Sequence, residues 1–347
     1  CGGLDPSLRR GRGNGLRMPS PPLIGPLGLL LPGVAWAGSV LDRVLERGKV
    51  VCAVDQTPGF GGFDDRGIPV GFEVDLCRAV AAAVLKNSQA IQVQRVTSKY
   101  KFHALADGEV DVALGMTTWT FDRDTTQTAL FPVVAFYDGQ GFMKWRDVAD
   151  PWATAASICV QSATTSAANL QEYLSRRGSS AKVLALSSSE EKLAAFAERR
   201  CGVVTGDSTE LAAQRSRRTA TVQGAWVPVE PIISREPLGP AVSAGDPEWF
   251  AIVRWAVLVP IIAEARGVGA RTLEATAASD TEMRSLKREE TGFGDGLRLD
   301  PAWARRIILA VGNYGEIFQR NLAPLGIERG RNALWTEGGL LYAPPLR

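Results

Sequence analysis

The sequence predicts an α/β protein of two lobes, with the chain crossing between them twice. The chain has 347 residues, which is more than one ordinary hydrophobic core serves. Strand-like and helix-like segments alternate along the first lobe, and the same order returns in the second. Two extended segments fall where the lobes join: the aromatic residues 131–143, and residues 232–242, which Pro237-Leu238-Gly239-Pro240 stiffens.

The first lobe is predicted from apolar periodicity and turn signals. A short helix over residues 39–47 is stopped by Gly48. A glycine-rich loop, residues 58–63, ends in the turn signal at residues 64–67. The other expected elements are a strand at 50–54, a helix at 72–85, a strand at 91–96, a helix at 102–107 and a buried strand at 110–114. This alternation predicts a mainly parallel sheet.

The second lobe repeats this order. Its expected elements are strands at 157–161, 181–186 and 202–205, and helices at 165–177, 189–199 and 208–216. A helix at 247–265 then rejoins the first lobe, and a tail helix at 301–321 packs on its core.

The division we predict along the mature chain has three parts. Residues 38–137 form the first part of lobe 1, residues 138–236 form lobe 2 with hinge strands at both ends, and residues 237–347 form the second part of lobe 1 with its helical tail. Two crossings make a hinge, and the cleft between α/β lobes is where ligands bind.

Residues 1–37 have the pattern of an export signal. Four arginines precede an apolar stretch, and Ala35-Trp36-Ala37 is a small-x-small cleavage pattern that makes Gly38 the mature N-terminus. A disordered tail is the alternative. Met18 is a second candidate for the first residue of the protein, but a signal that starts there has no basic residues at its N-terminus. A lipid anchor on Cys1 is disfavoured, because a signal-like run follows it.

Export places the chain in an oxidising compartment, where cysteines form disulfides. The four cysteines after Cys1 allow three connectivities. The most economical is one bridge in each lobe, Cys52–Cys77 and Cys159–Cys201. Four buried free thiols are the alternative.

Composition excludes several classes of function. A net charge of +2, with acids and bases interspersed, does not favour nucleic acid as a partner. No apolar run after residue 40 is long enough to span a bilayer. The single histidine, His103, removes most histidine-based metal sites and catalytic triads, so we expect no metal and no cofactor.

Three strand ends carry residues that suit an amino acid's charged groups. Arg123 follows the buried strand at 110–114, in a segment rich in hydroxyls such as Thr118, and an arginine holds a carboxylate well. Thr164 and Thr165 follow the strand at 157–161 and open a helix, and Asp207 follows the strand at 202–205. The alternatives are a surface Arg123 paired with a neighbouring aspartate, and simple helix capping by the others.

At these residues the sequence resembles the general L-amino-acid periplasmic binding proteins of polar-amino-acid ABC transporters. The resemblance covers nearly the whole mature chain. The matching segments are GFEVDLCRAV at 71–80, TTWT at 117–120 with Arg123 and Asp124, YDGQGFM at 137–143, IIS at 232–234 with EPLGPAV at 236–242, VGNYGEIF at 311–318, and YAPP at 342–345.

The resemblance implies a two-lobed clamshell of the type II solute-binding kind, located in the periplasm. It implies a receptor that binds free L-amino acids, works as a monomer, delivers its ligand to the permease of an ABC importer and is not an enzyme. Arg123 would hold the ligand carboxylate with Thr118 and with Thr164 or Thr165. Asp207 would hold the ammonium group, and Phe60 would lie over the ligand. The four cysteines also match the family's positions.

The sequence departs from the family pattern at several places. Met116 stands where relatives have a polar residue, and the loop at 60–63 is shorter and richer in glycine. Ala163 replaces a glycine that would allow a positive φ, so we expect a narrower ligand range or weaker binding.

Two other functions stay open. A periplasmic enzyme on the same scaffold, such as a dehydratase, needs a general acid or base in the cleft, and Asp207 is a candidate. A sensory module that serves a chemoreceptor would use the same binding chemistry.

Overall fold

The computed structural model describes residues 39–126, 129–153, 156–287 and 292–347. The expected export signal and its cleavage pattern lie outside these residues. Among the described helices, none is both long and apolar enough to cross a membrane.

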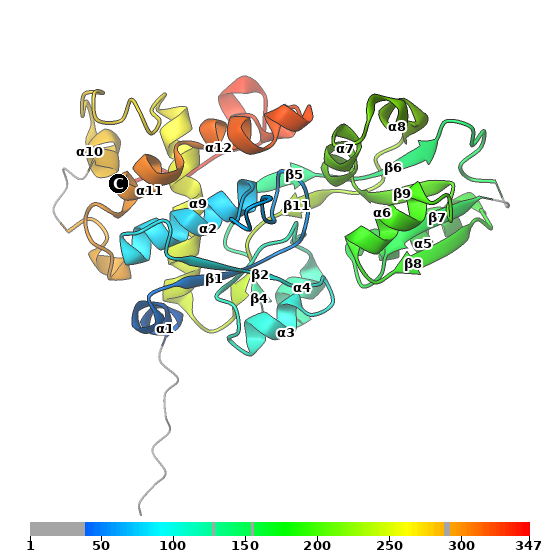
Figure 1. The fold of residues 1–347 in the computed structure, drawn as a ribbon. Coiled ribbons are helices and arrows are strands. Elements are labelled where there is room, and N and C mark those ends of the chain that lie inside the picture. The colour runs from blue at the N-terminus through cyan, green and yellow to red at the C-terminus, as the bar shows by residue number, and fades with distance from the viewer. Residues whose placement is uncertain (1–38, 127–128, 154–155, 288–291) are drawn as a thin grey trace, which may run out of the picture. The chain divides into compact units, whose positions relative to one another are not determined.

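Lobe 1 is built on a small parallel sheet with β1 in the middle, in the order β2-β1-β3 (Figure 1). Every residue of β1 is buried, and Cys52 pairs with Val93 on one side and with Val112 on the other. The elements are α1 (Val40–Arg47), β1 (Val50–Val54), α2 (Phe72–Leu85), β2 (Ile91–Arg95), α3 (Lys101–Ala106), β3 (Val112–Ala113) and α4 (Phe121–Thr126). These elements confirm the predicted order, and α4 was not predicted.

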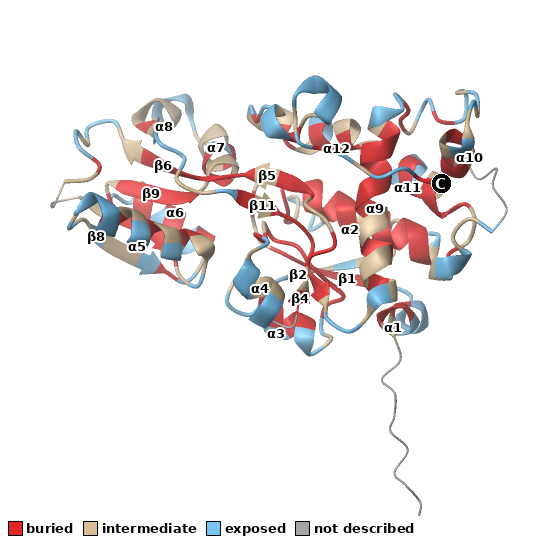
Figure 2. Ribbon diagram, turned by 180° about the vertical axis from the view of Figure 1, so that it is seen from behind, coloured by how far each residue is buried: buried red, intermediate tan, exposed pale blue. Residues whose placement is uncertain are grey.

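The C-terminal part of the chain adds a helical layer to lobe 1. It contains α9 (Pro247–Ala265), α10 (Thr281–Lys287), the short 3-10 turn at Asp295–Leu297, α11 (Trp303–Val311), α12 (Tyr314–Asn321) and three further 3-10 turns, at Ala323–Leu325, Gly330–Asn332 and Trp335–Glu337. Helices α2, α9 and α11 lie side by side, and Figure 2 shows buried residues concentrated along α2 and α9.

The prediction of one tail helix over 301–321 is wrong at Gly312. This glycine has φ 84° and ψ −170°, a conformation that ends α11. Asn313 then begins α12 with a capping box, in which its side chain accepts from the backbone N–H of Glu316 while the Glu316 side chain accepts from the backbone N–H of Asn313.

Lobe 2 is a five-stranded sheet in the order β10-β6-β9-β7-β8, with β7 parallel to β8 and β9. Strand β6 runs antiparallel to β9 and β10, so this sheet is mixed. The elements are β6 (Gln140–Trp145), β7 (Ser157–Gln161), α5 (Thr165–Arg177), β8 (Lys182–Leu186), α6 (Ser189–Ala197), β9 (Val203–Asp207), α7 (Ser208–Ser216), α8 (Ala220–Ala225) and β10 (Trp226–Val229).

Two antiparallel strands connect the lobes. Strand β5 (Phe136–Asp138) pairs with β11 (Glu236–Leu238), and Asp138 lies opposite Glu236. The lobe boundaries predicted from the sequence, after residues 137 and 236, fall within this pair. Nearby, β4 (Ala129–Leu130) pairs with β12 (Val242–Ser243).

Both predicted disulfides are present. Cys52 of β1 is bonded to Cys77 of α2, with 6.3 Å between their Cα atoms, and Cys159 of β7 is bonded to Cys201, with 5.8 Å. Each bridge joins an interior strand of one lobe to another segment of the same lobe, so the pairing of one bridge per lobe is confirmed.

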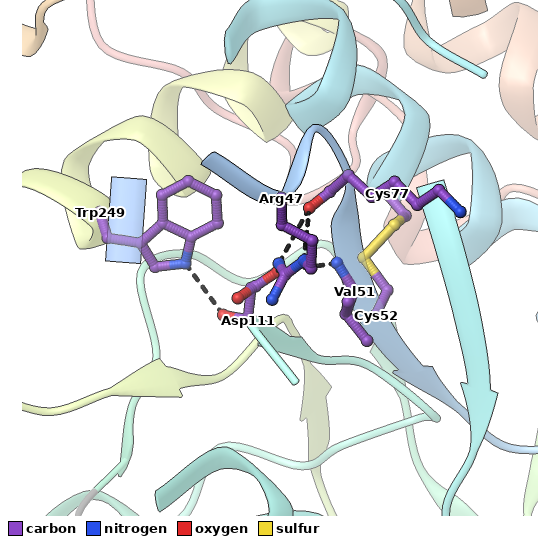
Figure 3. The surroundings of a disulfide bond; sticks show 7 residues. Arg47, Val51, Cys52, Cys77, Asp111 and Trp249 are labelled. Atoms are coloured by element: carbon purple, nitrogen blue, oxygen red, sulfur yellow. Dashed lines mark hydrogen bonds and ion pairs between the residues drawn. A yellow bond between two sulfur atoms is a disulfide. The ribbon is translucent and has the colours of Figure 1, made fainter. Parts of the chain in front are cut away.

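A buried aspartate organises the surroundings of the Cys52–Cys77 bridge (Figure 3). The Asp111 carboxylate accepts a 2.7 Å hydrogen bond from the backbone N–H of Val51 and forms an ion pair with Arg47. The Asp111 carbonyl accepts a 2.9 Å bond from the indole N–H of Trp249. Burial raises the pKa of Asp111. These contacts link α1, β1 and α9.

Candidate functional site

A polar pocket lies between the lobes at the ends of their strands. Its cavity measures about 40 Å³, within about 500 Å³ of empty space that includes open solvent. Five of the six residues predicted for the ligand line it: Thr118, Arg123, Thr164, Thr165 and Asp207. We call it the inner pocket. Its other lining residues are Asp55, Thr57, Ser98, Lys101, Gly115, Met116, Gln161, Ser166, Lys192, Gly206 and Glu210.

Arg123 is held in the pocket by contacts that leave most of its guanidinium free. One terminal nitrogen donates a 2.8 Å hydrogen bond to the carbonyl of Thr118, and the guanidinium lies 5.4 Å from the centre of the Phe102 ring. Burial lowers the pKa of Arg123, and the carboxylates of Glu236 and Asp207 oppose that shift. Within the described residues Arg123 forms no ion pair with a neighbouring aspartate, which was the alternative interpretation.

The two threonines of lobe 2 differ in what their hydroxyls do. Thr164 caps α5: its Oγ1 accepts from the backbone N–H of Ala167 and donates to the carbonyl of Gln161 at 2.7 Å. Thr165 Oγ1 donates instead to Glu236 at 3.2 Å and lies 3.4 Å from Thr118 Oγ1. The capping alternative therefore describes Thr164 and not Thr165.

Asp207 ends β9 at the N-cap position of α7, but its side chain makes no capping bond. Among the described residues its carboxylate has no hydrogen-bond or ion-pair partner. Burial raises the pKa of Asp207 well above its usual value, and the nearby carboxylates of Asp138, Glu210 and Glu236 raise it further. A cation placed beside this carboxylate would favour its charged form.

Two buried lysines that were not predicted from the sequence also line the inner pocket. Lys192 of α6 forms a 2.7 Å ion pair with Glu210 of α7. Lys101 donates to the carbonyl of Gly115 at 2.8 Å and to Thr117 Oγ1 at 2.9 Å, and burial lowers its pKa to about 8. Lys192 stands four residues before Phe196, on the inward face of the predicted helix. This spacing could have indicated that Lys192 is buried.

Asp55 was also not predicted, although it follows a strand directly, as Asp207 does. It follows β1 directly and lines the pocket, and burial raises its pKa.

A buried carboxylate holds the loop that carries Met116. Glu73 of α2 accepts hydrogen bonds from the backbone N–H groups of Gly115 (2.9 Å) and Met116 (2.7 Å). Burial raises the pKa of Glu73 to about 7. Met116 has φ 48° and Ala163 has φ 57°, so these two departures from the family pattern are in the left-handed region.

The structure places Phe60 elsewhere than expected. Its ring is 1% exposed and packs edge-on against Phe136 at 5.1 Å and Phe72 at 6.2 Å. It does not line the inner pocket, because the turn over residues 57–61 directs the ring into the apolar core of lobe 1. The prediction that Phe60 lies over the ligand is not met in this structure.

Two α/β lobes, an antiparallel strand pair between them and a charged pocket at their strand ends define a solute-binding protein of the two-lobed clamshell class. The chain belongs to the bacterial extracellular solute-binding proteins, family 3, which match residues 50–258. The resemblance seen in the sequence is thereby confirmed. No group of three or more His, Cys, Asp or Glu suited to a metal is found in the described part of the chain.

Similar proteins match over most of their length. The glutamate/glutamine/aspartate/asparagine-binding protein BztA of Rhodobacter capsulatus is 41% identical over 332 residues, covering 92% of this chain and 97% of that protein. The general L-amino acid-binding periplasmic protein AapJ of Rhizobium johnstonii is 39% identical, covering 93% and 97%. A solved periplasmic binding protein from Brucella ovis with glutathione bound is 36% identical with a TM-score of 0.84, covering 89% of this chain and all of that one.

Proposed function

We propose that this protein is a periplasmic receptor that binds free L-amino acids in the inner pocket and delivers them to the permease of an ABC importer. One observation carries the proposal: a guanidinium on lobe 1 and a carboxylate on lobe 2, neither with an ion-pair partner among the described residues, line the same pocket. An amino acid presents a carboxylate and an ammonium on one carbon, which is the complement of that pair.

The proposed roles follow from the contacts. Arg123 binds the ligand carboxylate, with the hydroxyls of Thr118 and Thr165 beside it. Thr164 contributes by capping α5, whose first backbone N–H groups attract an anion. Asp207 binds the ammonium group, which stabilises its otherwise costly charge.

The names of the relatives support this ligand class. BztA and AapJ are named for binding amino acids. The glutathione in the Brucella ovis structure keeps a free α-amino and a free α-carboxyl group on its glutamyl residue. These are the two groups that we assign to Asp207 and Arg123.

We infer that ligand binding closes the lobes about β5 and β11, with hinge boundaries near residues 137 and 236. Contacts that both lobes make with the ligand only in the closed form shift the open–closed equilibrium. We expect the receptor to act as a monomer without enzymatic activity, and the two disulfides suit an exported protein.

Isothermal titration calorimetry of residues 38–347 against the standard L-amino acids tests the proposal. We expect saturable binding that Arg123→Ala weakens by at least about 30-fold, since the loss of one partner of a buried charged pair costs 2 kcal/mol or more. Arg200→Ala, which changes an exposed arginine outside the pocket, is the control. Failure of every amino acid to bind contradicts the proposal. Conversion of a bound amino acid, followed by NMR, would support the enzyme alternative.

A further inference from the structure

A second and larger pocket lies beside the inner pocket, again with walls from both lobes. We call it the outer pocket. Its cavity measures about 630 Å³, against about 40 Å³ for the inner pocket. Gln56, Gly61 and Gly62 are on its lobe 1 side, and Glu190, Ala194 and Arg217 are on its lobe 2 side.

The same three segments form a wall of both pockets. After β1, Asp55 and Thr57 line the inner pocket while Gln56 and Pro58 line the outer one. On α6, Lys192 lines the inner pocket and Leu193 the outer one. On α7, Glu210 lines the inner pocket, and Gln214, one turn further, lines the outer one. The two spaces are therefore neighbours along one side of the cleft.

The shared side is one that the residues assigned to the ligand carboxylate leave unoccupied. Arg123, Thr118 and Thr165, which we assign to the ligand carboxylate, belong to segments that do not reach the outer pocket. We therefore infer that a ligand held by these residues and Asp207 directs its remaining substituent toward Asp55, Lys192 and Glu210, on the side of the outer pocket.

The outer pocket suits a polar extension that contains an amide. Its walls carry both signs of charge, with Glu190 and Glu198 opposed by Arg217 and Arg218. Gln56, whose side-chain carbonyl oxygen has no hydrogen-bond partner among the described residues, adds a neutral amide side chain to this wall. Gly61 and Gly62 also line this wall.

We propose that the receptor also binds amino acids whose side chain is extended through an amide bond, such as γ-glutamyl peptides, with the extension in the outer pocket. This inference rests on the proposed function. An ordinary α-linked peptide does not qualify, because its peptide bond uses the α-carboxyl of one residue and the α-amino group of the next. Only a side-chain linkage leaves both groups free on one carbon.

Calorimetry with two isomeric dipeptides tests the inference. We expect γ-glutamylglycine to bind with a Kd within about tenfold of that for glutamate, and α-glutamylglycine to bind at least about 100-fold more weakly. If free amino acids bind and γ-glutamylglycine binds no better than its α isomer, the inference is overturned while the proposed function stands. If no free amino acid binds, it is the proposed function that fails.

A substitution in the outer pocket locates the extension. Ala194 is exposed on α6 and lines the outer pocket, so Ala194→Trp fills part of that space. We expect it to raise the ratio of the γ-glutamylglycine Kd to the glutamate Kd at least tenfold. Ala310→Trp, at an exposed helical alanine of lobe 1 outside both pockets, should leave the ratio unchanged. An unchanged ratio in Ala194→Trp places the extension elsewhere and overturns the inference.

Discussion

Thr118 donates a 2.6 Å hydrogen bond from its Oγ1 to the carboxylate of Glu236, on the connecting strand β11. The same carboxylate accepts from Thr165 Oγ1 at 3.2 Å and from the side-chain amide of Asn169 at 3.0 Å. A hydroxyl has one proton to donate, so neither threonine can serve Glu236 and a ligand carboxylate at once. Glu236 therefore competes with the ligand for both hydroxyls.

Glu236→Gln is expected to tighten amino-acid binding by about 3- to 30-fold. A neutral amide oxygen accepts more weakly than a carboxylate, and the substitution removes a negative charge beside the ligand's own carboxylate. Calorimetry measures the change. Glu172→Gln, in an exposed ion pair with Arg176, is the matched control. Weaker binding by Glu236→Gln would mean instead that Glu236 orients the hydroxyls for the ligand.

Amino-acid binding is expected to weaken as the pH falls. The raised pKa of Asp207 means that the free protein holds this proton to a higher pH than an exposed aspartate does, and binding an ammonium group favours the ionised form. Binding then releases a proton, so the association constant rises with pH through the raised pKa. Calorimetry in buffers with different ionisation enthalpies measures the number of protons released for each ligand bound. Asp207→Asn should bind weakly and release none from this site. Proton release that persists in Asp207→Asn would assign it to another group, such as Asp138, whose pKa burial also raises.

Glu73→Gln should remove one component of the pH dependence of stability. Burial raises the folded-state pKa of Glu73 to about 7, above the usual 4.5, so its protonated form stabilises the fold below pH 4.5 and this contribution is lost as the pH rises to about 7. We expect the free energy of unfolding of wild type, relative to Glu73→Gln, to fall by roughly 1 to 3 kcal/mol across that interval. Urea unfolding at several pH values measures it. Parallel profiles for the two proteins would show that Glu73 has no raised pKa.

Ala163→Gly is expected to stabilise the protein by about 0.5 to 1 kcal/mol. Ala163 has φ 57°, where an L-residue with a Cβ is strained by about 1 to 2 kcal/mol, and the greater freedom of glycine in the unfolded chain offsets part of the gain. Denaturant unfolding checks it. Ala168→Gly, within α5, should instead cost about 1 kcal/mol. If both variants lose stability alike, the strain at residue 163 is absent. Unchanged or tighter ligand binding by Ala163→Gly would agree with a glycine being preferred there.

Much of the fold could be predicted because local signals agree with the tertiary structure. The helices at 72–85, 165–177 and 247–265 have the predicted bounds, since capping residues and turn glycines stand at or beside their ends. The helix break at Gly312 was not predicted, because apolar residues at helical spacing continue on both sides of it. The antiparallel position of β6 depends on long-range pairing with β9 and β10, which periodicity does not encode.

Position relative to a strand end predicted which residues would line the inner pocket. Arg123, Thr165 and Asp207 follow strand ends, and strand ends of both lobes meet at the inner pocket. Phe60 was predicted at the ligand and lies in the core, and Lys101 was not predicted, because neither position is decided by a strand end. Whether a loop aromatic or a helical lysine faces a core or a cleft depends on the packing of other segments, here Phe72, Phe136 and the loop at Gly115.

The most direct test of the central claim pairs each anchor with a ligand that lacks its partner group. Calorimetry compares an amino acid, its amide without the carboxylate and its α-hydroxy acid without the ammonium, on wild type, Arg123→Ala and Asp207→Asn. We predict that Arg123→Ala weakens the amino acid and the hydroxy acid but not the amide, and that Asp207→Asn weakens the amino acid and the amide but not the hydroxy acid. Equal losses for all three ligands in either variant would contradict the assignment of the carboxylate to Arg123 and the ammonium to Asp207.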